Sequence, residues 1–226
     1  MKAHLPFDTK LTRPTLALGA LRRSLLAACA AGLVLSSCFG GGSRPTSSGL
    51  AVVPSARTFV PSLPVGQPPF DDLQVSWVHR MDDTYVFLEH QGSYTDTAAH
   101  IPALLREMKV QGLEAAGPPF CLFYDDPAQT PVEQLRSRAC VPINGLRSPR
   151  SPLDYNFLPS RSVVYAFVSG PYPNAPRAYP KLFQEMERNG WVMDGPILER
   201  YIVPPEEAKA ASDFVCEIQI PFGRGE

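Results

Sequence analysis

The chain has 226 residues and a formal net charge of −1, from 21 lysines and arginines against 22 acidic residues. This balance argues against a nucleic-acid-binding protein, whose affinity for phosphates needs a cationic surface. Hydrophobic residues make up 44% of the chain, which is enough for a packed core and too much for an intrinsically disordered protein. The 25 prolines argue against long uninterrupted helices.

The N-terminal segment has the pattern of an export signal. Basic residues precede a short apolar run at 25–35, LLAACAAGLVL, which is too short for a membrane span of about 20 residues. The run ends in LSSC at 35–38, which resembles the bacterial lipobox, whose cysteine is diacylated and becomes the first residue after cleavage. Two acyl chains anchor a protein stably. We therefore predict a lipoprotein signal peptide over 1–38 with lipid on Cys38; an ordinary signal peptide that contains a cysteine is the alternative.

The route of export stays open, because RRSLL at 22–26 resembles a twin-arginine signal and general secretion is the other route. Phe39 follows the cysteine, in place of the aspartate associated with retention in the inner membrane. This favours the outer membrane. We expect a lipid-anchored protein of the bacterial cell envelope, with its folded part facing the periplasm or the exterior.

A linker is predicted over 39–70. It begins with three consecutive glycines and continues with six prolines, without a sustained helical or strand period. Such a composition is typical of a flexible and then semi-extended tether. The folded domain is expected over 71–226.

Three cysteines remain in that domain, Cys121, Cys140 and Cys216. They allow at most one internal disulfide, and the sequence does not say whether a pair forms or which one. Their spacing fits no zinc pattern. The chain also has no phosphate-binding glycine loop and no dinucleotide fingerprint, so no cofactor is predicted.

The domain contains an internal repeat at an offset of 78 residues. Between the segments 85–123 and 163–201, ten of 39 aligned positions are identical without a gap. Each copy has a β-rich segment, a Gly-x-Tyr turn and an apolar stripe at helical spacing. A glycine that can cap the helix and a Gly-Pro turn into another strand follow. The halves are about 71–144 and 151–222.

The repeat predicts two β-α-β-β units in one α+β domain, an antiparallel sheet with two helices and pseudo-twofold symmetry. Such a seam provides a central groove, where ligands often bind. Two further strands, Leu73–Arg80 and Leu153–Leu158, are expected as hairpin partners of the first strand in each half. The other predicted strands are Tyr85–His90, Phe120–Tyr124, Ala139–Ile143, Ser162–Val168, Ile197–Val203 and Phe214–Ile220.

Five motifs in order resemble the GyrI-like effector-binding domain of AraC- and MerR-type regulators, which is distantly related to SOUL haem-binding proteins. They are YVFLEHQGSY at 85–94, FYDDP at 123–127, CVP at 140–142, GPY at 170–172 and GPILERY at 195–201. The resemblance covers about 71–222. It implies a groove for hydrophobic, often cationic, small molecules. The regulators' DNA-binding helix-turn-helix is replaced here by the signal and tether, so transcriptional control is not expected.

The resemblance places a cation-binding acid at Glu199, followed by Tyr201 on the same face of its strand. Burial beside an aromatic raises the pKa of such a carboxyl until a cation pairs with it. A surface glutamate paired with lysine or arginine is the alternative. The repeat has Cys121 at the equivalent position, so only one half supplies an acid. The predicted ligand-binding residues are Glu199, Tyr201, Tyr94, Tyr172, Tyr165, Phe123 and Trp191.

Each of the other aromatic residues has a structural alternative: a turn-packing tyrosine for Tyr94 and Tyr172, core packing for Phe123 and Tyr165, and a lid over a helix end for Trp191. Three functions are therefore compared. The first is an envelope lipoprotein that binds a hydrophobic, cationic small molecule. The second is a hydrolase of reactive small molecules, with Glu199 as general base and Tyr201 or Trp191 placing the electrophile. The third is a structural lipoprotein with a closed groove.

Overall fold

The computed structural model describes residues 59–145 and 148–225, so the predicted signal peptide and Cys38 lie outside the described residues. Within this part, ten strands form one open sheet in the order β1-β7-β10-β9-β4-β5-β3-β6, with β2 beside β7 and β8 beside β10. Neighbouring strands are antiparallel, except for the short parallel pair of β1 and β7. The strands are Val65–Gly66 (β1), Ser76–Arg80 (β2), Asp83–Gln91 (β3), Phe120–Phe123 (β4), Arg136–Pro142 (β5), Asp154–Leu158 (β6), Arg161–Ser169 (β7), Trp191–Met193 (β8), Ile197–Tyr201 (β9) and Val215–Arg224 (β10).

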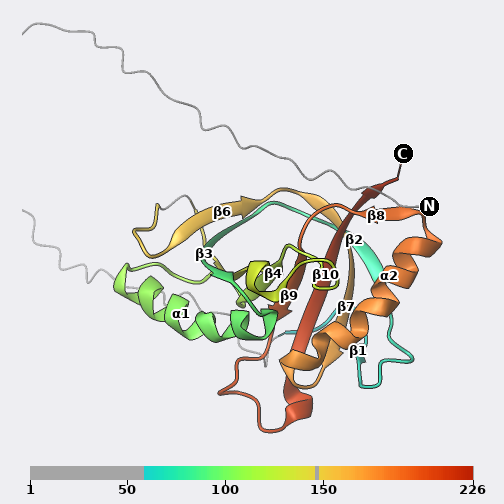
Figure 1. The fold of residues 1–226 in the computed structure, drawn as a ribbon. Coiled ribbons are helices and arrows are strands. Elements are labelled where there is room, and N and C mark those ends of the chain that lie inside the picture. The colour runs from blue at the N-terminus through green and yellow to red at the C-terminus, as the bar shows by residue number, and fades with distance from the viewer. Residues whose placement is uncertain (1–58, 146–147, 226) are drawn as a thin grey trace, which may run out of the picture. The chain divides into compact units, whose positions relative to one another are not determined.

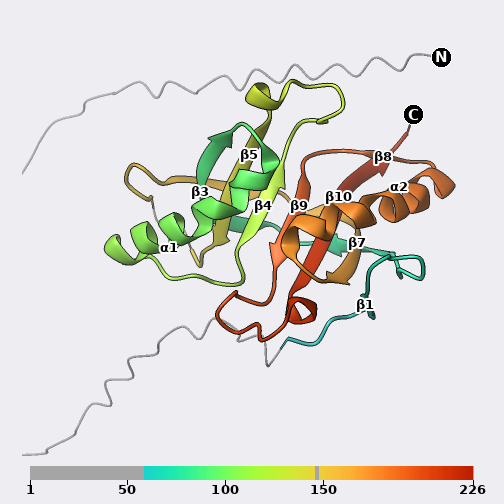
Figure 2. The same ribbon diagram turned by 60° about the horizontal axis from the view of Figure 1, so that its bottom comes forward.

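Two α-helices, α1 (Ile101–Val110) and α2 (Tyr179–Arg188), cover the same face of the sheet (Figures 1 and 2). Each follows a 3₁₀ turn and has proline as its second residue, where the missing N–H costs no hydrogen bond. A glycine with φ +66° stands two residues after the end of each helix, Gly112 and Gly190, which confirms the predicted left-handed caps.

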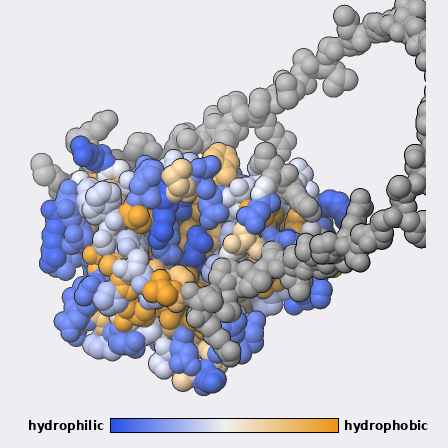
Figure 3. All heavy atoms as spheres, turned by 180° about the vertical axis from the view of Figure 1, so that it is seen from behind, coloured by the Kyte–Doolittle hydropathy of each residue, from blue (hydrophilic) through white to orange (hydrophobic). Residues whose placement is uncertain are grey.

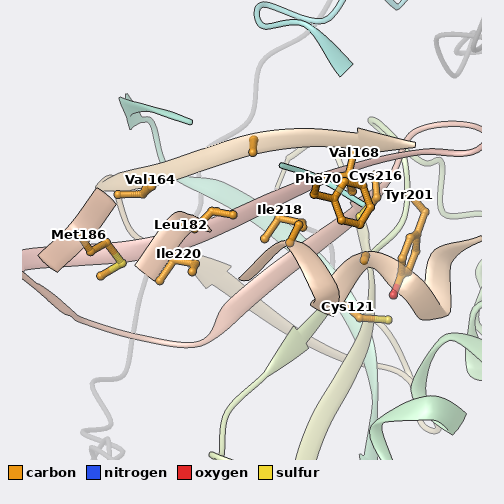
Figure 4. Close-up of a cluster of buried hydrophobic side chains, with 13 residues drawn as sticks. Phe70, Cys121, Val164, Val168, Leu182, Met186, Tyr201, Cys216, Ile218 and Ile220 are labelled. Carbon is orange, nitrogen blue, oxygen red and sulfur yellow. The ribbon is translucent and has the colours of Figure 1, made fainter. Parts of the chain in front are cut away.

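The helices bury the predicted stripes. Leu104 and Met108 of α1 pack on Val86 of β3 and Val141 of β5. Leu182 and Met186 of α2 pack on β7 and β10, in the cluster drawn in Figure 4. The α+β class and the two-helix, duplicated layout are therefore confirmed.

The two predicted hairpins do not form, because each of their first strands pairs with a strand of the other half. β2 pairs with β7, with Arg80 opposite Arg161, and β6 pairs with β3, with Asp83 opposite Leu158. Each half therefore gives its first strand to the other half. The connections at 81–82 and 159–160 are Met-Asp and Pro-Ser, whereas a two-residue hairpin needs residues that tolerate positive φ. Because Pro159 fixes a negative φ, the chain continues across the molecule in place of a turn.

The described part of the predicted tether packs on the sheet. Phe59 contacts Phe167 with ring centroids 5.5 Å apart, Val65–Gly66 forms β1, and Phe70 is only 2% exposed. The prediction of a free linker therefore does not hold over 59–70. The proline-rich composition suggested a linker, but the hydrophobic residues between the prolines pack on the domain: Phe59, Leu63, Val65 and Phe70.

The three cysteines of the domain are buried free thiols, which answers the question of disulfides that the sequence left open. In the described residues, neither helix is long and apolar enough to cross a bilayer. The surface seen from behind carries hydrophobic areas beside strongly hydrophilic ones (Figure 3).

Candidate functional site

The pseudo-twofold axis of the repeat passes between the two central strands. β4 and β9 are antiparallel neighbours, and Cys121 lies directly opposite Glu199. These two positions are also equivalent in the repeat, since they are 78 residues apart. The axis therefore runs between them, in the middle of the sheet, between α1 and α2 (Figure 2).

Glu199 points to the helix-covered face of the sheet and is only 3% exposed. Its Oε1 accepts a hydrogen bond of 2.7 Å from the Tyr179 hydroxyl, and its Oε2 accepts one of 3.1 Å from the Tyr201 hydroxyl. No lysine, arginine or histidine of the described residues forms an ion pair with it. The carboxyl group is therefore buried and has only neutral partners.

Burial raises the pKa of Glu199 from 4.5 to about 7, although the two tyrosine hydrogen bonds favour the charged form. The same burial raises the pKa of the Cys121 thiol to about 12, with the Glu199 charge acting in the same direction. The pKa of Tyr179 and that of Tyr201 are raised by burial and then by the charge of Glu199. Burial is therefore the largest cause of the pKa shifts at the seam, and the charge of Glu199 adds to it.

Tyr201 is placed as predicted, on the same face as Glu199. It is buried, and its ring centroid lies 4.5 Å from that of Tyr172. In Figure 4, Tyr201 and Cys121 lie at one end of the core cluster and Met186 lies at the other. Glu199, Tyr201 and Tyr172 thus form a small group of one acidic and two aromatic side chains.

Tyr94 and Tyr172 each hold a loop. The Tyr94 hydroxyl donates to the carbonyl oxygen of Asp125 at 2.9 Å and accepts from the N–H of the same residue at 2.8 Å. The Tyr172 hydroxyl bonds the carbonyl and the N–H of Val203 in the same way. Asp125 and Val203 are again 78 residues apart. Both hydroxyls thus have the loop-capping role that the sequence gave as an alternative, while the Tyr172 ring still borders Tyr201.

The remaining aromatic residues are dispersed. Phe123 lies two residues from Cys121 on the same face of β4 and contacts the Tyr94 ring, with centroids 4.9 Å apart. Trp191 stacks on Phe222 at 4.1 Å, four residues along β10 from the strand partner of Glu199, so it lies away from the acid.

Tyr165 lies on the opposite face of the sheet from Glu199. It is buried with Val163 and Phe167, and its hydroxyl contacts Ser62 at 3.1 Å. Strand alternation explains this, because Tyr165 pairs with Gln219, whose neighbour Ile218 shares the face of Glu199. The grouping of Tyr165 with Glu199 was therefore wrong.

Tyr179 is the residue that sequence reasoning missed. It is the first residue of α2, half-buried, and was assigned to the apolar stripe of the helix. Its equivalent in the first half is Ile101. The repeat carried the signal, because the second half replaces an apolar residue by a polar one at both of these facing positions, Ile101 by Tyr179 and Cys121 by Glu199.

The expected open groove is closed at this point. The carboxylate is covered by Tyr179 and Tyr201, and neither of two cavities, of about 340 and 380 Å³, is lined by Glu199. Among the described residues, no three acidic, histidine or cysteine side chains come together to hold a metal ion. The site is therefore a covered carboxyl group that two tyrosine hydroxyls hydrogen-bond.

The fold and the site together define a class of protein: a duplicated α+β domain with a buried acidic residue on its twofold seam. Residues 74–222 match the family model of the GyrI-like small molecule binding domain. This match spans most of the chain, so the chain belongs to that family, as the five motifs indicated.

Solved structures share the fold. The crystal structure of the EcmrR C-terminal domain is 20% identical with a TM-score of 0.61, over 68% of this chain and 99% of that one. EcmrR in a cryo-EM complex with DNA is 19% identical with a TM-score of 0.61, over 67% of this chain and 58% of that one. An uncharacterized conserved protein from Listeria innocua is 10% identical with a TM-score of 0.52, over 66% and 92%. No match was found among curated protein sequences.

Proposed function

We propose that the chain binds a hydrophobic organic cation at Glu199. The observation that carries this proposal is a buried carboxyl group whose described partners are all neutral. Burying such a charge costs free energy that a cationic partner would return. Membership of a small-molecule-binding family supports the same assignment.

Binding requires Tyr179 to leave the carboxylate. Its position at the first residue of α2, where it is half-buried, lets the side chain turn away without unfolding the helix. The Tyr179 ring lies edge-on to Phe183, with centroids 6.5 Å apart, and Phe183 is 40% exposed. We propose that the ligand enters between these two rings. Its positive charge then replaces the Tyr179 hydroxyl, and the Tyr201 and Tyr172 rings add cation–π contacts.

The test is titration with tetraphenylphosphonium, an apolar cation without hydrogen-bond donors. The protein is the full chain with Cys38→Ser, so that no lipid competes for the probe. Glu199→Gln is expected to weaken binding at least tenfold. Glu187→Gln, which removes an exposed acid of α2, is the matched control and is expected to bind normally. Neutral triphenylphosphine oxide is expected to bind weakly and equally to all three proteins. Equal affinity of Glu199→Gln and its parent for the cation would refute the proposal.

A hydrolytic role is the second candidate, because a carboxyl group with a pKa near 7 suits a general base at neutral pH. Only Tyr201 of the two predicted helpers lies beside Glu199. Turnover of an activated ester such as p-nitrophenyl acetate, lost in Glu199→Gln and kept in Glu187→Gln, would favour the enzyme. Stoichiometric cation binding without turnover is the result expected here. A chain that binds no probe and shows no thermal shift would fit the purely structural role.

We further propose that lipid on Cys38 anchors the chain in the cell envelope, with the outer membrane as the predicted site. The support is the LSSC pattern after the short apolar run. Cells labelled with palmitate are expected to incorporate label into the parent chain and not into Cys38→Ser. Cys29→Ser, within the apolar run, is the matched control and should be labelled normally. Density-gradient separation of the two membranes then tests the site, and label that persists in Cys38→Ser would contradict the anchor.

A further inference from the structure

A cavity of about 340 Å³ lies on the face of the sheet opposite Glu199. It lies beside the connection of β2 and β3 and the start of β7, where the chain leaves each exchanged strand for its own half of the sheet. Its polar lining includes Arg80, Arg161, Arg200, Asp83, Glu217 and Gln219.

Three guanidinium groups line this cavity, those of Arg80, Arg161 and Arg200. Arg80 and Arg161 lie opposite each other in the strand register. Arg80 is bonded to Glu217. Nη2 of Arg200 lies 3.4 Å from Oδ2 of Asp83, and Nε of Arg200 lies 3.8 Å from Oε2 of Glu217, which is an ion pair beyond hydrogen-bond distance. Arg161 forms no ion pair with a described residue, and its Nη1 donates only to the carbonyl oxygen of Pro159 at 3.1 Å.

Several polar atoms around the cavity are buried without a hydrogen-bond partner. In the described residues these are Nε of Arg80, Nε of Arg200 and Oε1 of Gln219. A buried donor without an acceptor loses its hydration and gains nothing in return, so such atoms call for an explanation. An oxyanion in the cavity would accept from both Nε–H groups.

The charge of the lining limits the kind of anion. Asp82 also lines the cavity, so three arginines face three carboxylates. A multiply charged anion such as inorganic phosphate would meet these carboxylates at close range. A single carboxylate can use the unpaired donors with less repulsion. The apolar lining of Phe59, Met81 and Ile202 suits a hydrocarbon portion.

The repeat shows that the fold does not require this polar group. The equivalents of Arg80 and Arg200 are Leu158 and Leu122, which pack together in a hydrophobic cluster of the first half. The equivalent of Gln219 by strand register is Cys140, a member of the same cluster. Three of the polar lining positions are thus filled by apolar residues in the other half, whereas Arg161 and Glu217 have polar equivalents, Asp83 and, by strand register, Arg138.

We propose that this cavity is a second binding site, which takes a small amphipathic monocarboxylate. The carboxylate lies beside Arg161 and accepts from Nε of Arg80 and of Arg200, and the apolar part lies on Phe59 and Ile202. The site is on the other face of the sheet from Glu199, so it does not depend on the proposed cation site.

Titration of the full chain carrying Cys38→Ser with octanoate tests this site, by calorimetry and by thermal shift. Octanoate is expected to bind and to raise Tm, whereas octanol and octylammonium at the same concentration bind at least tenfold more weakly. Arg161→Gln is expected to weaken octanoate binding at least tenfold and to leave tetraphenylphosphonium binding unchanged. Arg106→Gln, an exposed arginine of α1, is the matched control.

Three results would overturn the assignment: octanoate affinity unchanged in Arg161→Gln, equal binding of octanol and octanoate, or tighter binding of inorganic phosphate than of octanoate. Retained tetraphenylphosphonium binding and an unchanged circular dichroism spectrum report that Arg161→Gln is folded. If the variant unfolds, Arg161→Lys takes its place. It keeps the charge and is expected to retain the preference for octanoate over octanol, and a folded Arg161→Lys that loses this preference would also overturn the assignment.

Discussion

The two halves of the sheet share a backbone and differ in what they place on it. Each half of the sheet is counted here with the strand that it receives by exchange, β6 for the first half and β2 for the second. In the first half, Ile101 and Cys121 stand on the helix-covered face, and Leu122 and Leu158 fill the other face. In the second half, Tyr179 and Glu199 occupy the first pair of equivalent positions, and Arg200 and Arg80 the second. At these four positions the first half of the sheet is apolar, whereas the second half has polar side chains on both faces.

This difference teaches where function is to be sought in a duplicated domain. A polar residue that the fold needs is expected in both copies, as with the loop-capping hydroxyls of Tyr94 and Tyr172. A buried polar residue present in one copy alone costs stability that its twin avoids. Glu199 is of this second kind, and so are Arg80, Arg200 and Gln219 at the cavity on the other face. For this reason we propose a binding site at each place.

The largest expected effect tests the shared scaffold. Leu104→Ala in α1 and Leu182→Ala in α2 remove equivalent side chains that are fully buried. Each is expected to lower the free energy of unfolding by about 2–5 kcal/mol, through lost apolar burial and the cavity left behind. Urea denaturation of both variants measures this. A cost confined to one half would break the comparison, because the two helices would then not contribute equally to the stability of one sheet.

Much of this scaffold was predictable from the sequence, since the offset of 78 and the helical stripes are local patterns. The eight predicted strands are observed with shifted ends, as in β5, which begins at Arg136 and not at Ala139, whereas the short strands β1 and β8 were not predicted. The exchange of β2 and β6 was not predictable from pattern alone. A strand sequence shows which side chains are buried, but it does not identify the neighbouring strand.

The site divides in the same way. Glu199 was found through the resemblance to the GyrI-like family, and Tyr201 was grouped with it because residues two apart on a strand share a face. Tyr165 was misplaced because its face depends on the register of β7 against β10. Tyr179 was missed because a tyrosine in an apolar helical stripe looks like a core residue, and its contact with Glu199 spans 20 residues. Contacts between elements need tertiary structure, which the sequence pattern does not contain.

The second prediction concerns how the free energy of unfolding depends on pH through Glu199, the acid that replaces Cys121 of the first half. A carboxyl group whose pKa is higher in the folded protein than in the unfolded one takes up a proton on folding. Its contribution is therefore most favourable below pH 4.5 and is lost as the pH rises to about 7. One pKa unit corresponds to about 1.4 kcal/mol, so the loss comes to about 3 kcal/mol.

Glu199→Gln has no such charge to bury. Relative to the parent chain, its free energy of unfolding is expected to rise by about 3 kcal/mol between pH 4 and pH 8. Urea denaturation at both pH values measures the difference, in which all other titrating groups cancel. Tetraphenylphosphonium affinity should likewise fall about tenfold per pH unit below about 7, because the cation binds the ionised form. Parallel pH profiles of variant and parent would mean that Glu199 titrates normally.

The smallest effect asks whether the repeated tyrosines are equally important. Tyr172→Phe leaves the backbone N–H and carbonyl of the buried Val203 without the hydroxyl that they bond. Tyr94→Phe does the same to Asp125, which lies in a half-exposed loop that water can reach. We expect losses of about 2 and about 1 kcal/mol in the free energy of unfolding, since an unsatisfied buried group costs more than a hydrated one. Urea denaturation of both variants and of the double variant gives the two values and their additivity. A larger loss for Tyr94→Phe would show that the Asp125 loop, with its ion pair to Arg136, depends on the hydroxyl more than burial suggests.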